Sequence, residues 1–194
     1  MQKAIGSYEQ NLVIVREIGD RQGEGNSLGN LGIVYASLGE VQKAIGFHEQ
    51  ALVIAQEIGD RQGEGSELGN LGNAYASLGE VQKAIGYYEQ QLVIAREIGD
   101  RQGEGKALGN LGTAYMSLGE VQKAIGYHEQ ALVISREIGD RRGEGIDLGN
   151  LGTAYMRLGE VQKATSLLQQ AKSIGEQIGE PRIFEVAARA LEDL

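Results

Sequence analysis

Apolar residues recur every three or four positions along most of the chain. In one stretch they are Leu68, Leu71, Tyr75 and Leu78, and in the next they are Val81, Ala84, Ile85, Tyr88 and Leu92. This spacing places apolar side chains on one side of an α-helix, whereas a strand would alternate them at every second residue. Gly79 and Gly99 follow the two stretches, where a left-handed residue commonly ends a helix. The pattern therefore predicts pairs of helices joined by tight turns.

The same pattern returns with a period of 40 residues. Gly-Asp-Arg occurs at 19–21, 59–61, 99–101 and 139–141, and Leu-Gly-Asn occurs at 28–30, 68–70, 108–110 and 148–150. Segments 59–98 and 99–138 are identical at 33 of 40 positions. A fixed period in this range is typical of a solenoid, in which each unit buries its apolar face against its neighbours.

We expect an all-α solenoid of antiparallel helix pairs that forms a single array over residues 1–194. The repeats are 19–58, 59–98, 99–138 and 139–178, preceded over 1–18 by the lone second helix of a truncated repeat. The expected helices span about 2–18, 21–38, 40–58, 61–78, 80–98, 101–118, 120–138, 141–158, 160–178 and 182–194. Residues 180–194 hold a C-terminal capping helix, whose apolar stripe is Ile183, Phe184, Ala187, Leu191 and Leu194. Its other side is polar, as the end of a solenoid requires.

The unit resembles a tetratricopeptide repeat (TPR). The residues that carry the resemblance are the small Gly72, Tyr75, the second-helix Ala84 and the aromatic Tyr88. Its 40-residue length and Leu-Gly-Asn triplet are similar to the Leu-Gly-Asn repeat type, to kinesin light chains and to the sensor ends of some bacterial signalling ATPases. The resemblance implies a right-handed superhelix whose first helices line a concave face.

Composition narrows the possible functions. The chain has 27 acidic and 18 basic residues, so its net charge of -9 argues against nucleic acid or an anionic membrane as partner. It has no cysteine and two histidines, and no apolar run reaches the roughly 20 residues of a membrane span. We expect a cytoplasmic protein without metal or cofactor. We also expect no enzyme, because each carboxylate has copies in other repeats and catalysis requires one special site.

Three motifs favour structural roles. The glycine-rich stretch 103–109 lacks the preceding strand of a phosphate-binding loop and recurs as a helix start. His48 and His128 occupy the repeat position of Tyr88, which indicates packing rather than metal binding. Pairs such as Asp60-Arg61 suit a helix cap and surface charge.

Positions on the predicted concave face differ between repeats, which indicates a graded binding surface, although drift at unconstrained positions explains the variation as well. Asparagine is constant at Asn30, Asn70, Asn110 and Asn150. An amide pairs with a peptide bond through both its donor and its acceptor. The neighbouring Gly29, Gly69, Gly109 and Gly149 leave room for a peptide backbone. Alternatively, each asparagine bonds locally.

The candidate peptide-binding residues beside this asparagine ladder are Asn73, Lys106, Thr113, Met116, Thr153, Met156 and Arg157. They predict a scaffold or adaptor that holds a peptide or helix of a partner protein in its groove. One alternative is a sensor segment of a larger signalling ATPase. Another is a self-assembling structural array, since the apolar residues of the first helix, Ala4, Ile5, Tyr8 and Leu12, are partly uncovered.

Overall fold

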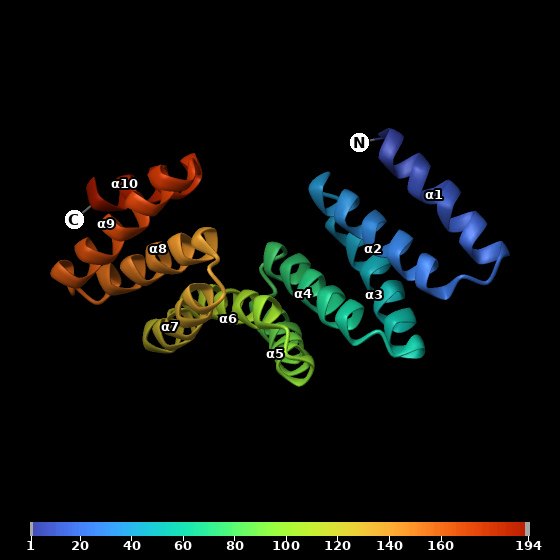
Figure 1. Ribbon diagram of the computed structural model, residues 1–194, viewed down its shortest axis with the longest axis horizontal. Coiled ribbons are helices and arrows are strands. Elements are labelled where there is room, and N and C mark those ends of the chain that lie inside the picture. Colours follow the sequence, from blue (N-terminus) through green and yellow to red (C-terminus); the bar gives the residue numbers. More distant parts are fainter. Residues whose placement is uncertain (1, 193–194) are drawn as a thin grey trace. The chain divides into compact units, whose positions relative to one another are not determined.

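The computed structural model describes residues 2–192, which form ten α-helices joined by turns of two or three residues (Figure 1). The helices are α1 (Gln2–Glu17), α2 (Arg21–Ser37), α3 (Val41–Ile58), α4 (Arg61–Ser77), α5 (Val81–Ile98), α6 (Arg101–Ser117), α7 (Val121–Glu137), α8 (Arg141–Arg157), α9 (Val161–Ile178) and α10 (Pro181–Glu192). The all-α fold of repeated helix pairs is confirmed. Within the described residues the helices begin and end within one residue of the expected ranges, and the expected end of the last helix at 194 lies outside them.

The helices form two compact units, one up to Asp100 with α1–α5 and one from Arg101 with α6–α10. In the first unit, each helix packs against the next, most extensively in the pairs α2–α3 and α4–α5. In the second unit, α6 pairs with α7 and α8 with α9, and α7 packs against α8. Each repeat therefore contributes a first helix (α2, α4, α6, α8) and a second helix (α3, α5, α7, α9).

Glycine and aspartate set the helix ends. Gly79 has a φ of 78° and Gly99 a φ of 70°, which is the left-handed region that glycine enters without strain, as expected for these turns. Asp20, Asp60 and Asp140 each accept a 2.9 Å hydrogen bond from the backbone N–H three residues on. These carboxylates satisfy amides that the first turn of α2, α4 and α8 would leave unpaired.

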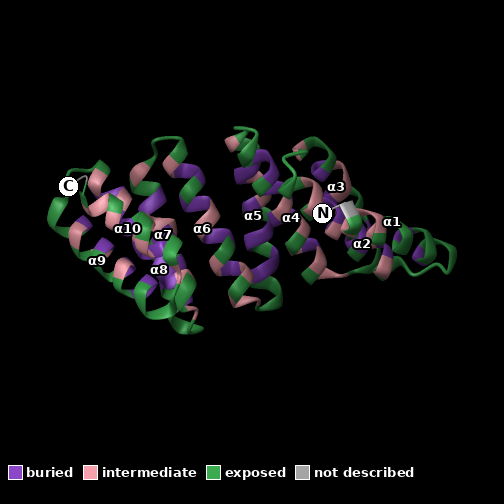
Figure 2. Cartoon of the chain, turned by 90° about the horizontal axis from the view of Figure 1, so that it is seen from above, coloured by how far each residue is buried: buried purple, intermediate pink, exposed green. Residues whose placement is uncertain are grey.

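The core lies between neighbouring helices (Figure 2). Leu68 and Leu71 are 2% and 0% exposed, and their counterparts in other repeats are buried to the same degree. Gly72 faces the ring of Tyr88, so a side chain at this position would collide with it. His48 and His128 fill the same slot against Gly32 and Gly112, which matches the packing role predicted for them.

The terminal helices differ in how they are covered. Helix α10 packs against α9 and α8 and buries Ile183 and Ala187. Leu194, the last residue of the predicted stripe, lies outside the described residues. Helix α1 packs on α2 through Leu12 and Val15, while its residues Ile5 and Tyr8 are only partly buried.

Candidate functional site

The predicted groove residues lie on the first helices, on α2 and α4 in the first unit and on α6 and α8 in the second. The four ladder asparagines, together with Met116, Thr153 and Met156, are half-buried, whereas Asn73, Lys106, Thr113 and Arg157 are exposed. We call the three positions of the first unit and the eight of the second the first-helix surface of their unit. None is buried, so each retains some solvent access.

The ladder asparagines differ in their local contacts. Asn70 Nδ2 lies 3.5 Å from Glu67 Oε2, a long hydrogen bond one turn away on the same helix. The amides of Asn30 and Asn150 have no hydrogen-bond partner among residues 2–192. At least two of the four amides therefore keep their donors and acceptors for a ligand.

Other residues of this surface are engaged within the fold. The Tyr88 hydroxyl donates a 2.8 Å hydrogen bond to Asn73 Oδ1, which ties α5 to α4. Thr113 and Thr153 each donate a 3.0 Å hydrogen bond to the carbonyl four residues earlier. Arg157 Nη1 donates to the backbone carbonyl of Met116 over 3.1 Å and so links α8 to α6. Arg157 therefore makes a structural contact that its position in the sequence did not reveal.

In the first unit, the space beside the glycines that precede the asparagines is already filled by other side chains. Gly29 and Gly69 are buried. A Cβ at Gly29 would come within 2.6 Å of Glu67 Oε1, and one at Gly69 within 2.7 Å of Gln91 Nε2. These glycines make room for side chains of neighbouring helices, so the expectation that they admit a peptide backbone is wrong there.

A small hollow lies on the first unit between α2, α3 and α4. It is lined by Gln22, Gly25, Asn26, Ala51, Ile54, Ala55, Ile58, Asp60, Gly63 and Glu67, and we call it the α2–α4 hollow. Its floor is formed by the apolar side chains of Ala51, Ile54 and Ala55, which are buried with exposed fractions of 2%, 4% and 6%. Gln22 on one wall donates a 3.0 Å hydrogen bond to Asp60 on the other.

Each described contact between a second helix and the next first helix carries different polar groups. Asn11 donates to Ser27 between α1 and α2 over 2.8 Å. His48 Nδ1 lies 2.6 Å from Glu67 Oε2 between α3 and α4. Ser135 donates to Asp147 between α7 and α8. These pairs distinguish helix contacts that are otherwise nearly identical in sequence.

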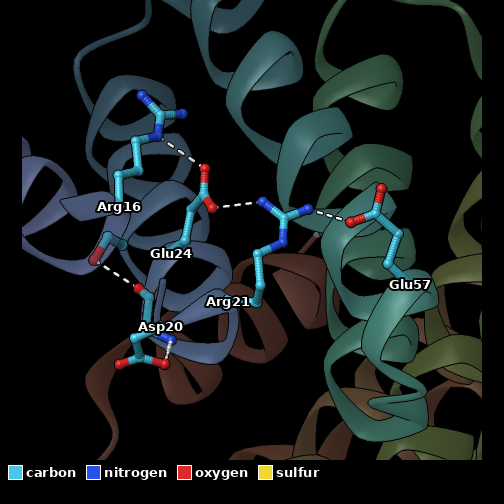
Figure 3. Close-up of polar contacts among 7 residues, drawn as sticks. Arg16, Asp20, Arg21, Glu24 and Glu57 are labelled. Carbon is cyan, nitrogen blue, oxygen red and sulfur yellow. Dashed lines mark hydrogen bonds and ion pairs between the residues drawn. The ribbon is translucent and has the colours of Figure 1, made fainter. Parts of the chain in front are cut away.

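The Gly-Asp-Arg turns form a network of ion pairs (Figure 3). Arg21 donates from one guanidinium to Glu24 on its own helix and to Glu57 on α3, and Arg16 of α1 donates to Glu24 over 2.8 Å. The hydrogen bond from Arg16, with help from Arg21, lowers the pKa of the Glu24 carboxyl against the opposing effect of burial. The network thus joins three consecutive helices.

The first three repeats each carry an aromatic stack between their two helices. The rings of Tyr75 and Tyr87 are parallel with centroids 5.3 Å apart, and Lys83 Nζ lies 3.7 Å from the Tyr75 centroid. Tyr115, Tyr127 and Lys123 repeat this arrangement in the second unit. Stacking and the cation–π contact hold the first helix against the second.

Residues 2–192 hold neither a metal-ligand cluster nor a membrane-spanning helix. No group of three or more histidine, aspartate or glutamate side chains within this range could hold a metal ion. No helix in the described part of the chain has the length and apolar character needed to cross a bilayer.

Comparison with known protein families identifies the family of this chain. The sequence model of the tetratricopeptide repeat family matches residues 1–57, 66–137 and 104–177. The chain belongs to the tetratricopeptide repeat family. Tetratricopeptide repeats are generally non-enzymatic scaffolds for protein–protein interaction. A comparison with curated protein sequences finds no significant match.

Three solved tetratricopeptide-like structures show the same fold. BtubC from P. vanneervenii is 20% identical with a TM-score of 0.79, and the match covers 99% of this chain and 87% of that one. A signal transduction ATPase with a tetratricopeptide repeat sensor from Pyrococcus horikoshii is 22% identical with a TM-score of 0.81, over 95% of this chain and 29% of that one. A Rap protein complexed with Competence and Sporulation Factor is 18% identical with a TM-score of 0.81, over 92% and 50%.

Proposed function

We propose that the chain is a cytoplasmic, non-enzymatic adaptor that holds an extended peptide of a partner protein along its first-helix surface. The observation that carries this proposal is that each unit has a first-helix asparagine, Asn30 in the first and Asn150 in the second, whose amide has no hydrogen-bond partner among residues 2–192. An amide at the same turn of repeated first helices suits a peptide backbone, whose own amides recur along its length. The side chains that vary between repeats then select the sequence.

Further support comes from how the remaining polar groups are used. The guanidinium of Arg21 and the carboxylate of Glu24 pair within the fold, as do their counterparts Arg61 and Glu64. These groups hold the helices together, whereas the amides of Asn30 and Asn150 are not used in this way. The structural likeness to a Rap protein complexed with Competence and Sporulation Factor is consistent with an array that binds another molecule.

The test is affinity capture from a lysate of the source organism, followed by mass spectrometry and direct binding measurements. The variant is Asn30→Ala with Asn150→Ala, which removes no hydrogen bond of the fold. The control variant is Gln42→Ala with Gln82→Ala, which removes two exposed amides from second helices. A partner retained by the wild type and the control but lost by the asparagine variant supports the proposal. The proposal is contradicted if all three proteins capture the same partner equally, or if the wild type captures no other protein.

The second candidate is the sensor segment of a larger signalling ATPase. It is favoured by the likeness to the Pyrococcus horikoshii protein, of which the match covers 29%. The full-length coding sequence decides between the two candidates. A nucleotide-binding domain in the same reading frame supports the sensor, and its absence removes this candidate.

A further inference from the structure

The α2–α4 hollow combines an apolar floor with two carboxylates. Its lining includes Asp60 and Glu67 and contains no lysine or arginine. Hydrogen bonds from Gln22 and from the backbone of Gly63 lower the pKa of the Asp60 carboxyl, so this group is ionised at neutral pH. The lining therefore concentrates negative charge beside buried aliphatic side chains.

Both carboxylates keep capacity for another donor. Asp60 accepts from Gln22 on Oδ2 and from the backbone of Gly63 on Oδ1, and the backbone of Gln62 also donates toward this carboxyl. Glu67 accepts from His48 and Asn70 on Oε2, while its Oε1 has no donor among residues 2–192. A carboxylate offers about four acceptor sites. A donor that enters the hollow can therefore bind Asp60 without displacing these contacts.

Lysine and arginine match this lining. Each carries a cationic donor on an aliphatic stem, and the stem packs on apolar surface while the charged end reaches polar groups. A purely apolar side chain would cover the floor but leave the remaining acceptor sites of Asp60 without a donor, which costs free energy. An acidic side chain would be repelled by both carboxylates, and the net charge of -9 also disfavours acidic partners.

The lining is specific to this part of the array. Eighty residues further on, Lys106 stands where the hollow has Asn26. Asp147 stands where the hollow has Glu67, and it is buried and accepts from Ser135. The corresponding place in the second unit thus carries its own cation and a carboxylate already engaged within the fold.

We propose that the α2–α4 hollow binds the side chain of one lysine or arginine in the partner peptide and so fixes the register of that peptide. This inference rests on the proposed function, since it assumes a peptide along the first-helix surface. It assigns the chemistry of one side chain of the partner.

The test uses a phage-displayed library of random twelve-residue peptides selected on the full chain. The inference predicts that enriched peptides share a basic residue at one fixed position. A synthetic copy of the best peptide is then titrated in a fluorescence polarisation assay. Replacement of its basic residue by norleucine, which keeps the aliphatic stem, is expected to weaken binding by about tenfold, as for one close charge pair.

Variants of the protein test the same contact by changing the lining of the hollow instead of the peptide. Asn26→Lys introduces the cation of the second unit at an exposed position, and Glu67→Gln removes a carboxylate charge while keeping an acceptor for His48. Each variant is expected to bind the peptide about tenfold more weakly at low salt, with a smaller effect at high salt. Gln42→Lys, exposed on α3 outside the lining, is the matched control and should bind as the wild type does.

The outcomes separate the two proposals. Enriched peptides without a shared basic residue, or equal binding of the norleucine peptide, overturn the inference and leave the adaptor function intact. If no peptide is enriched over a surface without protein, both proposals fail. Circular dichroism of each variant confirms folding, and the norleucine comparison uses only the wild-type protein.

Discussion

Ser135 and Asp147 form a buried hydrogen bond between α7 and α8, in which the Ser135 hydroxyl donates to Asp147 Oδ2 over 2.8 Å. Asp147 is only 6% exposed. Burial raises the pKa of its carboxyl from 3.8 to about 7, against the opposing effect of the Ser135 hydrogen bond. The charge of Asp140 adds to the increase. Between these two pKa values the folded chain binds a proton that the unfolded chain has lost, so this group lowers stability as pH rises through the window.

Replacing Asp147 by asparagine tests this assignment. Asparagine keeps an acceptor for Ser135 and carries no charge, so we expect Asp147→Asn to be more stable than the wild type at pH 8 and similar to it near pH 4. The measurement is the midpoint of urea unfolding, followed by circular dichroism across this range. Glu176→Gln, at an exposed position of α9, is the control. Parallel pH curves for wild type and Asp147→Asn would show that Asp147 is not the titrating group.

His128 has the opposite pH dependence. Burial lowers the pKa of its imidazole from 6.5 to about 4, and its Nδ1 has no hydrogen-bond partner in the described structure. The unfolded chain therefore binds more protons between these values, and stability falls as pH drops through them. Tyr88 occupies the equivalent position in the preceding repeat, so we expect a tyrosine at this position to fit. The stability of His128→Tyr relative to the wild type should therefore increase as the pH falls from 7 to 5. Urea unfolding at both pH values measures this increase. The same difference in unfolding free energy between variant and wild type at pH 7 and pH 5 would contradict the account.

Two glycines of one repeat should respond oppositely to alanine. Gly86 lies inside α5, where an added Cβ would meet nothing within 4 Å, whereas Gly72 faces the ring of Tyr88. We expect Gly86→Ala to stabilise the chain by about 1 kcal/mol through helix propensity. Gly72→Ala should destabilise it, because the Tyr88 ring must move. The shifts in the urea midpoint measure both effects, and a shift of the same sign for both variants would be inconsistent with this packing.

Asp20 caps α2 through the backbone N–H of Gly23. Asp20→Ala removes that acceptor and is expected to cost about 1 kcal/mol of unfolding free energy. Asp20→Asn keeps an amide oxygen at the same place and should lose much less. Thermal unfolding of the three proteins compares them. Equal losses for alanine and asparagine would mean that charge, rather than the cap, supplies the stabilisation.

The fold was predictable from the sequence because each repeat restates the same local signals. Gly79 and Gly99 mark turns, and Leu68 and Leu71 recur at helical spacing and are buried. The 40-residue period then fixes which helices are neighbours. Such signals depend on local conformation and on packing against an adjacent repeat, and both can be read from a single chain.

The site was less predictable because side chains from different repeats compete for the same space. Gly29 was expected to admit a ligand, yet its free space holds the Glu67 carboxylate from the next first helix. Arg157 was assigned to the groove, yet it bonds the Met116 carbonyl across one repeat. The pairing of Arg21 with Glu57 likewise joins positions 36 residues apart, a relationship that only the packed helices define.

The central claim is that asparagine amides of the first helices bind the backbone of a partner peptide. Nuclear magnetic resonance of side-chain amides, with the library-selected peptide titrated into isotopically labelled protein, tests it most directly. The account predicts that the asparagine amide signals of the unit that holds the peptide, Asn30 and Asn70 or Asn110 and Asn150, move with peptide concentration. The exposed second-helix amides of Gln42 and Gln82 should stay in place. Movement of the glutamine signals with unchanged asparagine signals would contradict the claim.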